Sequence, residues 1–375
     1  MKQLKAWGRT WGPLLGIALI AVALLVVAPA VLSPFRLNNL GKYVCWAIAG
    51  VGIGLAWGRG GMLVLGQGVF FGLGGYAMAM HMKLADAGPG KVPDFMSWSG
   101  VEKLPAIWKP FEHGWFAVGA VLVIPMVVAF LLGSLVFRRR VRGAYFAILT
   151  QALASAFVIL LVGQQGLTGG TNGLTNVNDF LGKNLDDSNA TQQLYLLAVI
   201  VLGIAYFLAR QLIRSRYGRL LIAVRDGEDR VRFLGYDPAT VKTIAFTFSA
   251  GLAGLAGALF VPIVGIISPA MLGVVPSIEM VIWVALGGRA TLVGAVAGAL
   301  IVNYAKSSLS NEFPSFWTYF QGAMFIVVIA FLPKGVAGGL QSLRTTIGLR
   351  LKGEGGKPVA TDKATEAPTP ETISA

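Results

Sequence analysis

Residues 115–137 read WFAVGAVLVIPMVVAFLLGSLVF, and three arginines, Arg138, Arg139 and Arg140, follow them directly. The stretch holds no charged residue and exceeds the roughly 20 residues that cross the hydrocarbon core of a bilayer as an α-helix. In lipid, a helix satisfies the backbone hydrogen bonds within a single segment. These residues therefore predict a transmembrane helix that ends at a basic, cytoplasmic boundary.

The composition of the whole chain agrees with this segment. Of its 375 residues, 55% are hydrophobic and 13% are charged, against about 25% charged in an ordinary soluble domain. Glycine occurs 49 times, and it is more frequent in membrane helices than in soluble ones. We expect an all-α membrane protein, a polytopic bundle of about ten transmembrane helices.

Ten apolar stretches are the predicted spans. The second and the eighth are short, and the sequence leaves open whether they cross completely. In chain order the stretches are 12–32, 43–58, 61–82, 115–137, 143–163, 193–213, 241–265, 271–287, 290–306 and 316–333.

Lysine and arginine are unevenly distributed around these stretches. With the N-terminus placed in the cytoplasm, 23 of the 31 basic residues fall on the cytoplasmic side, in agreement with the positive-inside rule. The net charge of +14 is therefore a topology signal, and no nucleic-acid partner is expected. An even number of spans then predicts that both termini are cytoplasmic.

The predicted organisation has three parts. Residues 1–11 are a cytoplasmic N-terminus, residues 12–336 are the membrane domain with a cytoplasmic segment at about 214–241, and residues 337–375 are a cytoplasmic tail. From about residue 353 the tail has too few large apolar residues to fold, so disorder is expected. The basic N-terminus before an apolar run also fits a cleavable signal peptide, but a run of about 20 residues exceeds the usual 7–15, which favours a retained helix.

The chain lacks the residues that several classes of function need. One cysteine, Cys45, and two histidines, His81 and His113, cannot form a Cys/His metal cage. The Gly-rich stretch 166–173 lacks the Lys-Ser/Thr pair of a phosphate-binding loop. No pair of carboxylates and no Ser-His set lies in the predicted spans. We therefore expect no enzyme activity, no metal and no cofactor.

Polar residues in or beside the spans are the candidates for a solute pathway. Glu279 is the one acid within a span, where an ionisable group is costly unless it is paired or hydrated. It is either a functional group or a structural hydrogen-bonding group near a helix start, and the sequence shows no ionisable partner for it. Neutral polar residues either hold helices together or line a hydrogen-bonding path. The candidates are Gln67, Gln151, Glu279 and Asn303 in spans, and Thr168, Gly169, Gly170 and Asn172 in an outer loop.

The cytoplasmic segment 214–241 predicts a short helix at about 218–234. Apolar residues recur there at helical intervals among mixed charges: Leu220, Leu221, Val224, Val231 and Leu234. A rigid helix of this kind can dock in a groove on a partner, and the alternative is a plain surface helix in a basic loop. The candidates for the docking contact are Arg219, Ala223, Arg225, Asp226, Gly227, Glu228 and Gly235.

Four stretches resemble the permeases of branched-chain amino acid ATP-binding-cassette (ABC) importers: 167–173, 218–235, 245–258 and 277–294. Within that family, three stretches are most similar to the urea-transporting branch: 65–68 (LGQG), 273–280 (GVVPSIEM) and 331–335 (FLPKG). The amino acid permeases more often carry a Gly-His pair where Gly66-Gln67 stands. This departure favours urea.

The resemblance implies the membrane subunit of an ABC importer for urea in the bacterial inner membrane, with branched-chain amino acids as the alternative solute. It also implies the partners: a second homologous permease, two cytoplasmic ATPase subunits and a periplasmic solute-binding protein, besides membrane lipid. ATP hydrolysis would belong to the ATPase subunits. The rival interpretation is a secondary carrier or channel that works alone, with Glu279 as a coupling acid.

Overall fold

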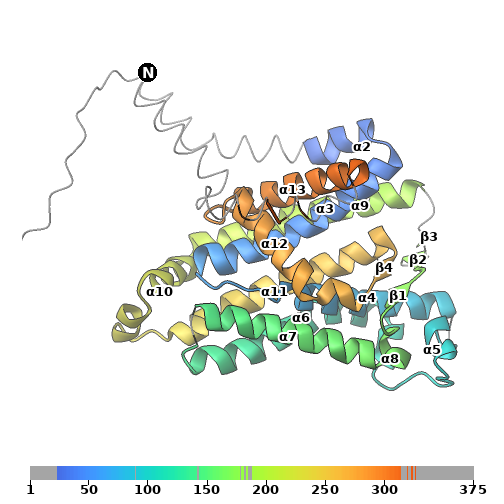
Figure 1. The fold of residues 1–375 in the computed structure, drawn as a ribbon, viewed down its shortest axis with the longest axis horizontal. Coiled ribbons are helices and arrows are strands. Elements are labelled where there is room, and N and C mark those ends of the chain that lie inside the picture. The colour runs from blue at the N-terminus through green and yellow to red at the C-terminus, as the bar shows by residue number, and fades with distance from the viewer. Residues whose placement is uncertain are drawn as a thin grey trace, which may run out of the picture.

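The computed structural model describes residues 23–313, with gaps at 89, 142, 178, 181–182 and 185–187, and single positions between 319 and 326. In Figure 1 the long helices run side by side along the long axis of the molecule. α10 (Arg216–Phe233) lies at one end, and α5 (Asp94–Trp98) and α8 (Gln165–Thr168) lie at the other. We call these the α10 end and the α5 end.

Among the described residues, six helices are long and apolar enough to cross a membrane. This confirms the prediction of an all-α, multi-pass membrane protein, but not the predicted count of about ten spans. Two further helices lie among them, α4 (Gln67–Ala87) and the shorter α12 (Val274–Gly287). The six are α3 (Pro34–Ile53) with the π-helical turn η2 (Gly54–Arg59) that continues it, α6 (Gly114–Arg138), α7 (Ala144–Gly163), α9 (Ser188–Arg214), α11 (Pro238–Val264) and α13 (Leu292–Glu312).

Two helices, α3 and α12, differ in length from what a membrane span at the predicted positions would need. The second prediction, 43–58, was too short, because the helix begins at Pro34, where proline suits the first turn, and runs on to Arg59. Arg36 and Lys42 interrupt the apolar pattern that sets the predicted start. α12 has 14 residues, about 21 Å of helix, and is too short to cross alone. The first and tenth predicted spans, the N-terminus 1–11 and the tail 337–375 lie wholly or largely outside the described residues.

The core is built around α11, which is buried along most of its length. Glycines let α4 approach it closely: a Cβ on Gly74 would overlap the carbonyl oxygen of Gly254, and one on Gly257 would overlap that of Phe71. α12 and α13 meet in the same way at Gly287 and Gly298. Small residues at these contacts let the helix backbones approach closely.

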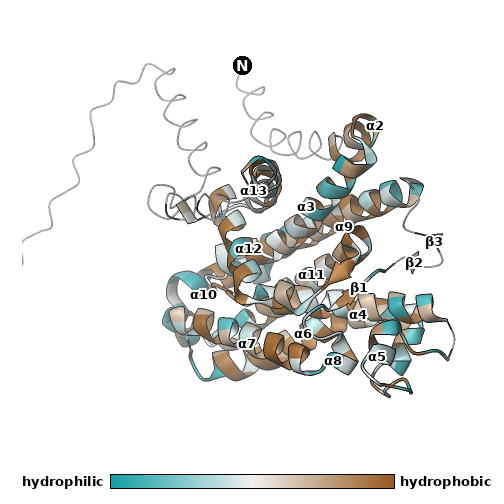
Figure 2. Cartoon of the chain, turned by 45° about the vertical axis from the view of Figure 1, so that its right-hand side comes forward, coloured by the Kyte–Doolittle hydropathy of each residue, from teal (hydrophilic) through white to brown (hydrophobic). Residues whose placement is uncertain are grey.

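The outer faces of α6, α7 and α9 are apolar. Exposed side chains there include Leu135, Ile159 and Phe207. Figure 2 shows hydrophobic colour along these helices, whereas hydrophilic residues gather around α5 and at the α10 end. Exposed apolar side chains on these helices fit contact with lipid, and the two polar ends fit the two membrane surfaces.

Short elements close the α5 end. η1 (Ala23–Val27) and α2 (Ala28–Val31) precede α3, while α5 and η3 (Lys109–Glu112) follow α4. β1 (Leu174–Thr175) pairs antiparallel with β4 (Ile266–Ile267), and β2 (Asp179–Phe180) pairs with β3 (Lys183–Asn184). From β4 the chain turns back through η4 (Pro269–Leu272) into α12.

Candidate functional site

α4 begins inside the bundle and not at its end. After η2 the chain runs without helix until Gln67, which opens α4 beside the middle of α11. Nε2 of Gln67 donates to the carbonyl oxygen of Ser249 at 3.1 Å and to its hydroxyl at 3.2 Å. Irregular backbone at this depth of a membrane protein is tolerated where it is buried in protein or lines a cavity.

α12 begins at the same place as α4. The backbone N–H of Gly68 donates to Oγ of Ser277 at 2.9 Å, and this hydroxyl donates to the carbonyl of Gly273 at 2.8 Å. From the third side, the N–H of Leu65 donates to Oγ1 of Thr150 on α7 at 3.1 Å. We call this meeting of four helices the α4–α12 junction, and its polar side chains are Gln67, Thr150, Ser249 and Ser277.

The junction is polar, uncharged and incompletely hydrogen-bonded. All four of its side chains are buried, and among the described residues Oε1 of Gln67 has no hydrogen-bond partner. The N-termini of α4 and α12 add backbone N–H groups and the positive ends of two helix dipoles. Transporters often bind their solute where discontinuous helices meet near the bilayer midplane. The junction is therefore the candidate solute site.

Gln151 and Asn303 differ in their relation to this junction. Gln151 directly follows Thr150, the α7 residue of the junction, and is half-buried. Nδ2 of Asn303 donates to the carbonyl of Ala299, one turn earlier in α13, at 2.7 Å. Asn303 is thus bonded within its own helix, and nothing in this contact connects it to the junction.

Glu279 has an ionisable partner that the sequence did not indicate. Nζ of Lys306 on α13 donates to both carboxylate oxygens of Glu279 on α12, at 2.8 and 3.0 Å. The side chain of Glu279 is 13% exposed and that of Lys306 is 35% exposed. The sequence did not indicate this partner because the predicted ninth span ended at residue 306. In the structure α13 runs on to Glu312, which places Lys306 inside the helix. Pairing lowers the cost of a charge at this depth.

The predicted outer loop is a tight turn that begins at Thr168, the last residue of α8. The hydroxyl of Thr168 donates to the carbonyl of Leu161 at 2.6 Å. Gly169 and Gly170 have φ angles of 79° and 59°, which glycine adopts without strain, and a Cβ on Gly169 would overlap the carbonyl of Gly173. Asn172 is exposed at the tip. The loop positions β1 beside β4, the strand that leads toward the junction.

α10 is the predicted cytoplasmic helix, but its shape and its apolar face differ from the expectation. Gly227 has the non-helical angles φ −168° and ψ 76°, which kink the helix. Leu221, Val224 and Val231 are buried, and Leu221 packs at Gly60 after η2. The expectation of a straight, rigid helix whose apolar positions enter a partner was wrong for these three residues, because the chain itself covers them.

Polar contacts fix α10 to the membrane helices. Arg225 donates through Nη1 to the carbonyl of Gly58 at 2.9 Å and through Nε to Asp226 at 2.7 Å. The hydrogen bond from Arg225 holds the pKa of Asp226 below its usual value. Glu228 pairs with Lys242 of α11 at 2.5 Å. A displacement of α10 therefore acts directly on η2 and α11.

The exposed surface of α10 is polar along the helix and apolar at its end. Arg219 and Ala223 face outward, and Gly235, with a φ of 84°, turns the chain toward α11. Three large side chains project from this turn: Phe233, Leu234 and Tyr236, which are 92%, 75% and 56% exposed. We call residues 233–236 the α10–α11 turn.

Sequence reasoning missed several residues of the site. Thr150 and Ser249 are single hydroxyl residues in apolar stretches, and no local pattern marks them. Ser277 follows a proline in a pattern typical of a helix start, which did not identify it as a residue of the site. Lys306 carried a signal, since it follows Asn303 by almost one helical turn in a stretch that reads as helix up to residue 312. In the part of the chain that the structure describes, no group of three or more His, Cys, Asp or Glu residues could hold a metal.

Comparison with known proteins places these features in a family. The chain matches the family described as branched-chain amino acid transport system / permease component over residues 35–329. The high-affinity branched-chain amino acid transport system permease protein LivM of Salmonella typhimurium is 26% identical over 345 residues, 86% of this chain and 74% of LivM. LivM of Escherichia coli is 26% identical over 330 residues, 82% of this chain and 71% of that protein.

A third relative is named for a different solute. The autoinducer 2 import system permease protein LsrC of Photorhabdus laumondii is 26% identical over 220 residues, 56% of this chain and 62% of LsrC. No solved structure matches the chain. The family match covers α4, α12 and the α4–α12 junction as well as α10. The chain therefore belongs to the family of permease components of branched-chain amino acid transport systems.

Proposed function

We propose that this chain is the membrane subunit of an ABC importer that moves urea from the periplasm to the cytoplasm across the bacterial inner membrane. The observation that carries the proposal is the α4–α12 junction, where buried polar groups without charge meet at the starts of two helices. Urea is small, neutral and rich in hydrogen-bond donors and acceptors, so it needs such groups and no counter-charge.

The charges inside the bundle support a neutral solute. Glu279 and Lys306 bind each other with two hydrogen bonds, so neither is held ready for a solute of the opposite charge. An amino acid zwitterion carries a carboxylate and an ammonium group, and burying each without a counter-charge is costly. The unpartnered Oε1 of Gln67 is instead an acceptor that suits an N–H of urea.

The proposed mechanism needs partners that supply energy and solute. A second homologous permease would complete the pathway, two cytoplasmic ATPase subunits would hydrolyse ATP, and a periplasmic binding protein would deliver urea. The α10 end is the proposed cytoplasmic end, in line with the basic residues there. The α10–α11 turn is the proposed ATPase contact, because Phe233 and Leu234 are its exposed apolar groups and apolar groups of this kind anchor interfaces.

A second candidate is the import of branched-chain amino acids, the transport for which the two LivM relatives are named. The two candidates differ in the solute that the binding protein and the junction accept. Uptake by the reconstituted importer, with labelled urea and labelled leucine in parallel, separates them. Uptake of leucine without urea would overturn the urea proposal and leave the importer proposal standing.

The same vesicles test the rival class of function. If this chain worked alone as a carrier or channel, vesicles with the chain and no ATPase subunits would take up solute without ATP. The proposal expects uptake only with both permeases, the ATPase subunits, the binding protein and ATP. A variant of the ATPase that cannot hydrolyse ATP is the matched control, since it preserves assembly and removes the energy source.

A further inference from the structure

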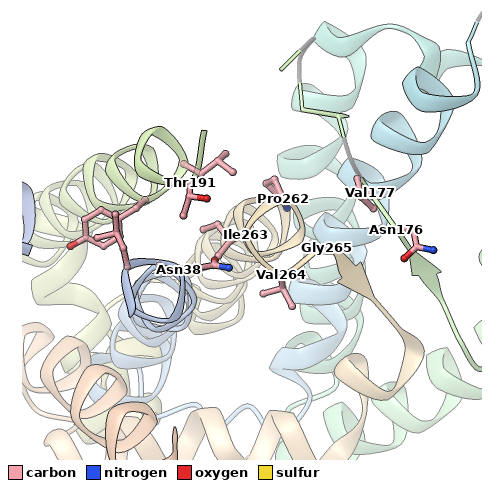
Figure 3. A pocket seen from close by; sticks show the side chains of 12 residues that line it. Asn38, Asn176, Val177, Thr191, Pro262, Ile263, Val264 and Gly265 are labelled. Carbon is pink, nitrogen blue, oxygen red and sulfur yellow. The ribbon is translucent and has the colours of Figure 1, made fainter. Parts of the chain in front are cut away.

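A cavity of about 290 Å³ opens at the α5 end, far along α11 from the α4–α12 junction. It lies between the first turns of α3, the first turns of α9, the last turn of α11 and the chain just after β1. Figure 3 shows Asn38 of α3 and Thr191 of α9 beside the end of α11, where Pro262, Ile263 and Val264 lie. None of these elements has a role in the junction apart from α11.

The last turn of α11 forms one wall of the cavity. The last carbonyl groups of an α-helix have no intrahelical N–H partner. At the end of α11 the N–H of Gly265 donates a hydrogen bond to the carbonyl of Val261 at 2.7 Å. Gly265 has a φ of 78°, a left-handed conformation that ends the helix. The next residues, Pro262, Ile263 and Val264, line the cavity. The negative end of the α11 dipole points the same way.

The remaining wall combines neutral polar groups with open space. Asn38 and Asn176 contribute amide groups and Thr191 a hydroxyl, and no Asp, Glu, Lys or Arg lines the cavity. Gly41 leaves space in the cavity because it has no side chain. A Cβ at this position would already touch Cδ1 of Ile263 at 3.4 Å. Alanine would just fit at this position, whereas a larger side chain would enter the cavity.

We propose that this cavity is an outer binding site for urea, occupied before the solute reaches the α4–α12 junction. The inference rests on the function proposed above. Carbonyl oxygens at the end of α11 would accept hydrogen bonds from the amino groups of urea, and the amide of Asn38 would donate to its carbonyl oxygen. A nearby cation, Lys83, donates through Nζ to the carbonyl of Asn176 at 2.8 Å and is thereby engaged by the wall itself. A zwitterion would place its carboxylate at the negative end of the α11 dipole, so leucine should bind poorly.

The position of the cavity fits an outer site. Its wall includes Asn176 and Val177, which follow β1 directly. β1 is held against β4 by the pairing of Leu174 with Ile267, and β4 leads through η4 to the start of α12. The chain thus connects the cavity wall to the junction by one short path, on the side where the glycine turn 168–173 lies.

Cysteine labelling in the assembled importer tests the site directly. The native thiol, Cys45, is fully buried, so Asn38→Cys or Thr191→Cys would each supply one accessible thiol. A membrane-impermeant maleimide should label both from the periplasmic side. Urea at its own dissociation constant should slow labelling about twofold, since half of the sites are then occupied, and leucine at the same concentration should not. Gln192→Cys, exposed one residue further along α9, should be labelled at a rate that urea leaves unchanged.

A second pair of variants tests whether urea occupies the volume of the cavity. Gly41→Leu should fill the cavity, abolish the protection of Thr191→Cys by urea and raise the urea concentration for half-maximal uptake at least several-fold. Gly203→Leu, at an exposed glycine of α9 with open space around it, is the matched control and should change neither.

Labelling and uptake are separate readouts, so the two proposals can fail separately. Absent labelling, or labelling that urea does not slow, in an importer that takes up urea overturns the outer site and leaves the transport proposal intact. An importer that takes up leucine and not urea overturns the transport proposal, and protection by leucine alone overturns the outer site for urea as well.

Discussion

Lys306 donates two hydrogen bonds to Glu279, joining α13 to α12 by an ion pair within the membrane domain. α12 is the helix that begins at the α4–α12 junction, and Ser277, two residues before Glu279, accepts the N–H of Gly68. The pair therefore fixes the short helix that carries one side of the candidate solute site. Because Lys306 is 35% exposed, we expect the second permease or the water of the pathway to cover it, and not lipid.

Removing one member of the Glu279–Lys306 pair should lower the free energy of unfolding more than removing both. Glu279→Gln leaves the Lys306 ammonium without its partner, and Lys306→Met leaves the carboxylate. Breaking a fully buried pair costs about 3–5 kcal/mol, and exposure reduces this, so each single variant should lose about 1–3 kcal/mol. Thermal unfolding in detergent should show the double variant Glu279→Gln/Lys306→Met to be more stable than either single one. Additive losses would contradict the coupling.

Substitution in the outer glycine turn should destabilise the chain locally. Gly169→Ala forces a Cβ toward the carbonyl of Gly173 at a φ of 79°, where strain costs about 1–3 kcal/mol. Gly119→Ala, on a helix face with nothing within 4 Å, is the control and should be neutral or slightly stabilising. Protease sensitivity at the turn reports the difference. Equal stability of the two variants would mean that the turn has room to relax.

The α10–α11 turn should cross-link to an ATPase subunit. Cysteine at Ala223 or Leu234 is exposed on this surface and should form disulfides with cysteines placed on the ATPase in an active complex. Phe233→Ser should lower ATP-driven uptake without unfolding the permease, because the side chain is 92% exposed. Leu221→Ser, at a fully buried site, should instead reduce stability. Normal uptake by Phe233→Ser with no cross-link at either cysteine would remove the turn from the coupling path.

The stability that the Asp237 N-cap gives to the start of α11 should depend on pH. The side-chain hydroxyl of Thr240 donates to Asp237 at 2.6 Å, and the N–H groups of Ala239 and Thr240 add to it, so the pKa of Asp237 lies below its usual value. A depressed folded-state pKa means that the cap stabilises fully above the unfolded value of about 3.9 and is lost as the pH falls through the folded value.

Two variants of Asp237 separate the cap from its charge. Asp237→Ala should lose about 1 kcal/mol at neutral pH, the usual value of an N-cap. Asp237→Asn retains a capping oxygen, so it should lose little at neutral pH and show a smaller decline on acidification than the parent. Thermal unfolding between pH 7 and pH 3 measures both. An acid decline in the Asn variant equal to that of the parent would assign the effect to another group.

Gln67 should contribute to urea uptake through the unpartnered oxygen Oε1, and to stability through its hydrogen bonds and packing. Gln67→Leu removes the hydrogen bonds to Ser249 and should lower both stability and urea uptake. Ser249→Ala removes one hydroxyl, leaves the backbone bond of Gln67 in place, and should cost about 1 kcal/mol with uptake largely preserved. Uptake assays on matched amounts of assembled complex compare them. Equal uptake by both variants and the parent would exclude the junction as the solute site.

The sequence by itself determined the class of protein and much of its layout. Apolar length sets where helices cross, as 115–137 did for α6, and this follows from bilayer thickness without any tertiary contact. Local signals also placed α10 to within two residues.

Only the tertiary structure decided which polar residues meet. Gln67 and Ser249 are 182 positions apart, and Glu279 and Lys306 come from different helices, so their partners depend on how helices pack and not on local pattern. The same holds for α10, where the sequence showed apolar positions but packing against η2 and α11 decided that Leu221 and Val224 face inward. Hydrophobic periodicity reports that a face is buried, whereas the identity of the surface that buries it is a property of the whole fold.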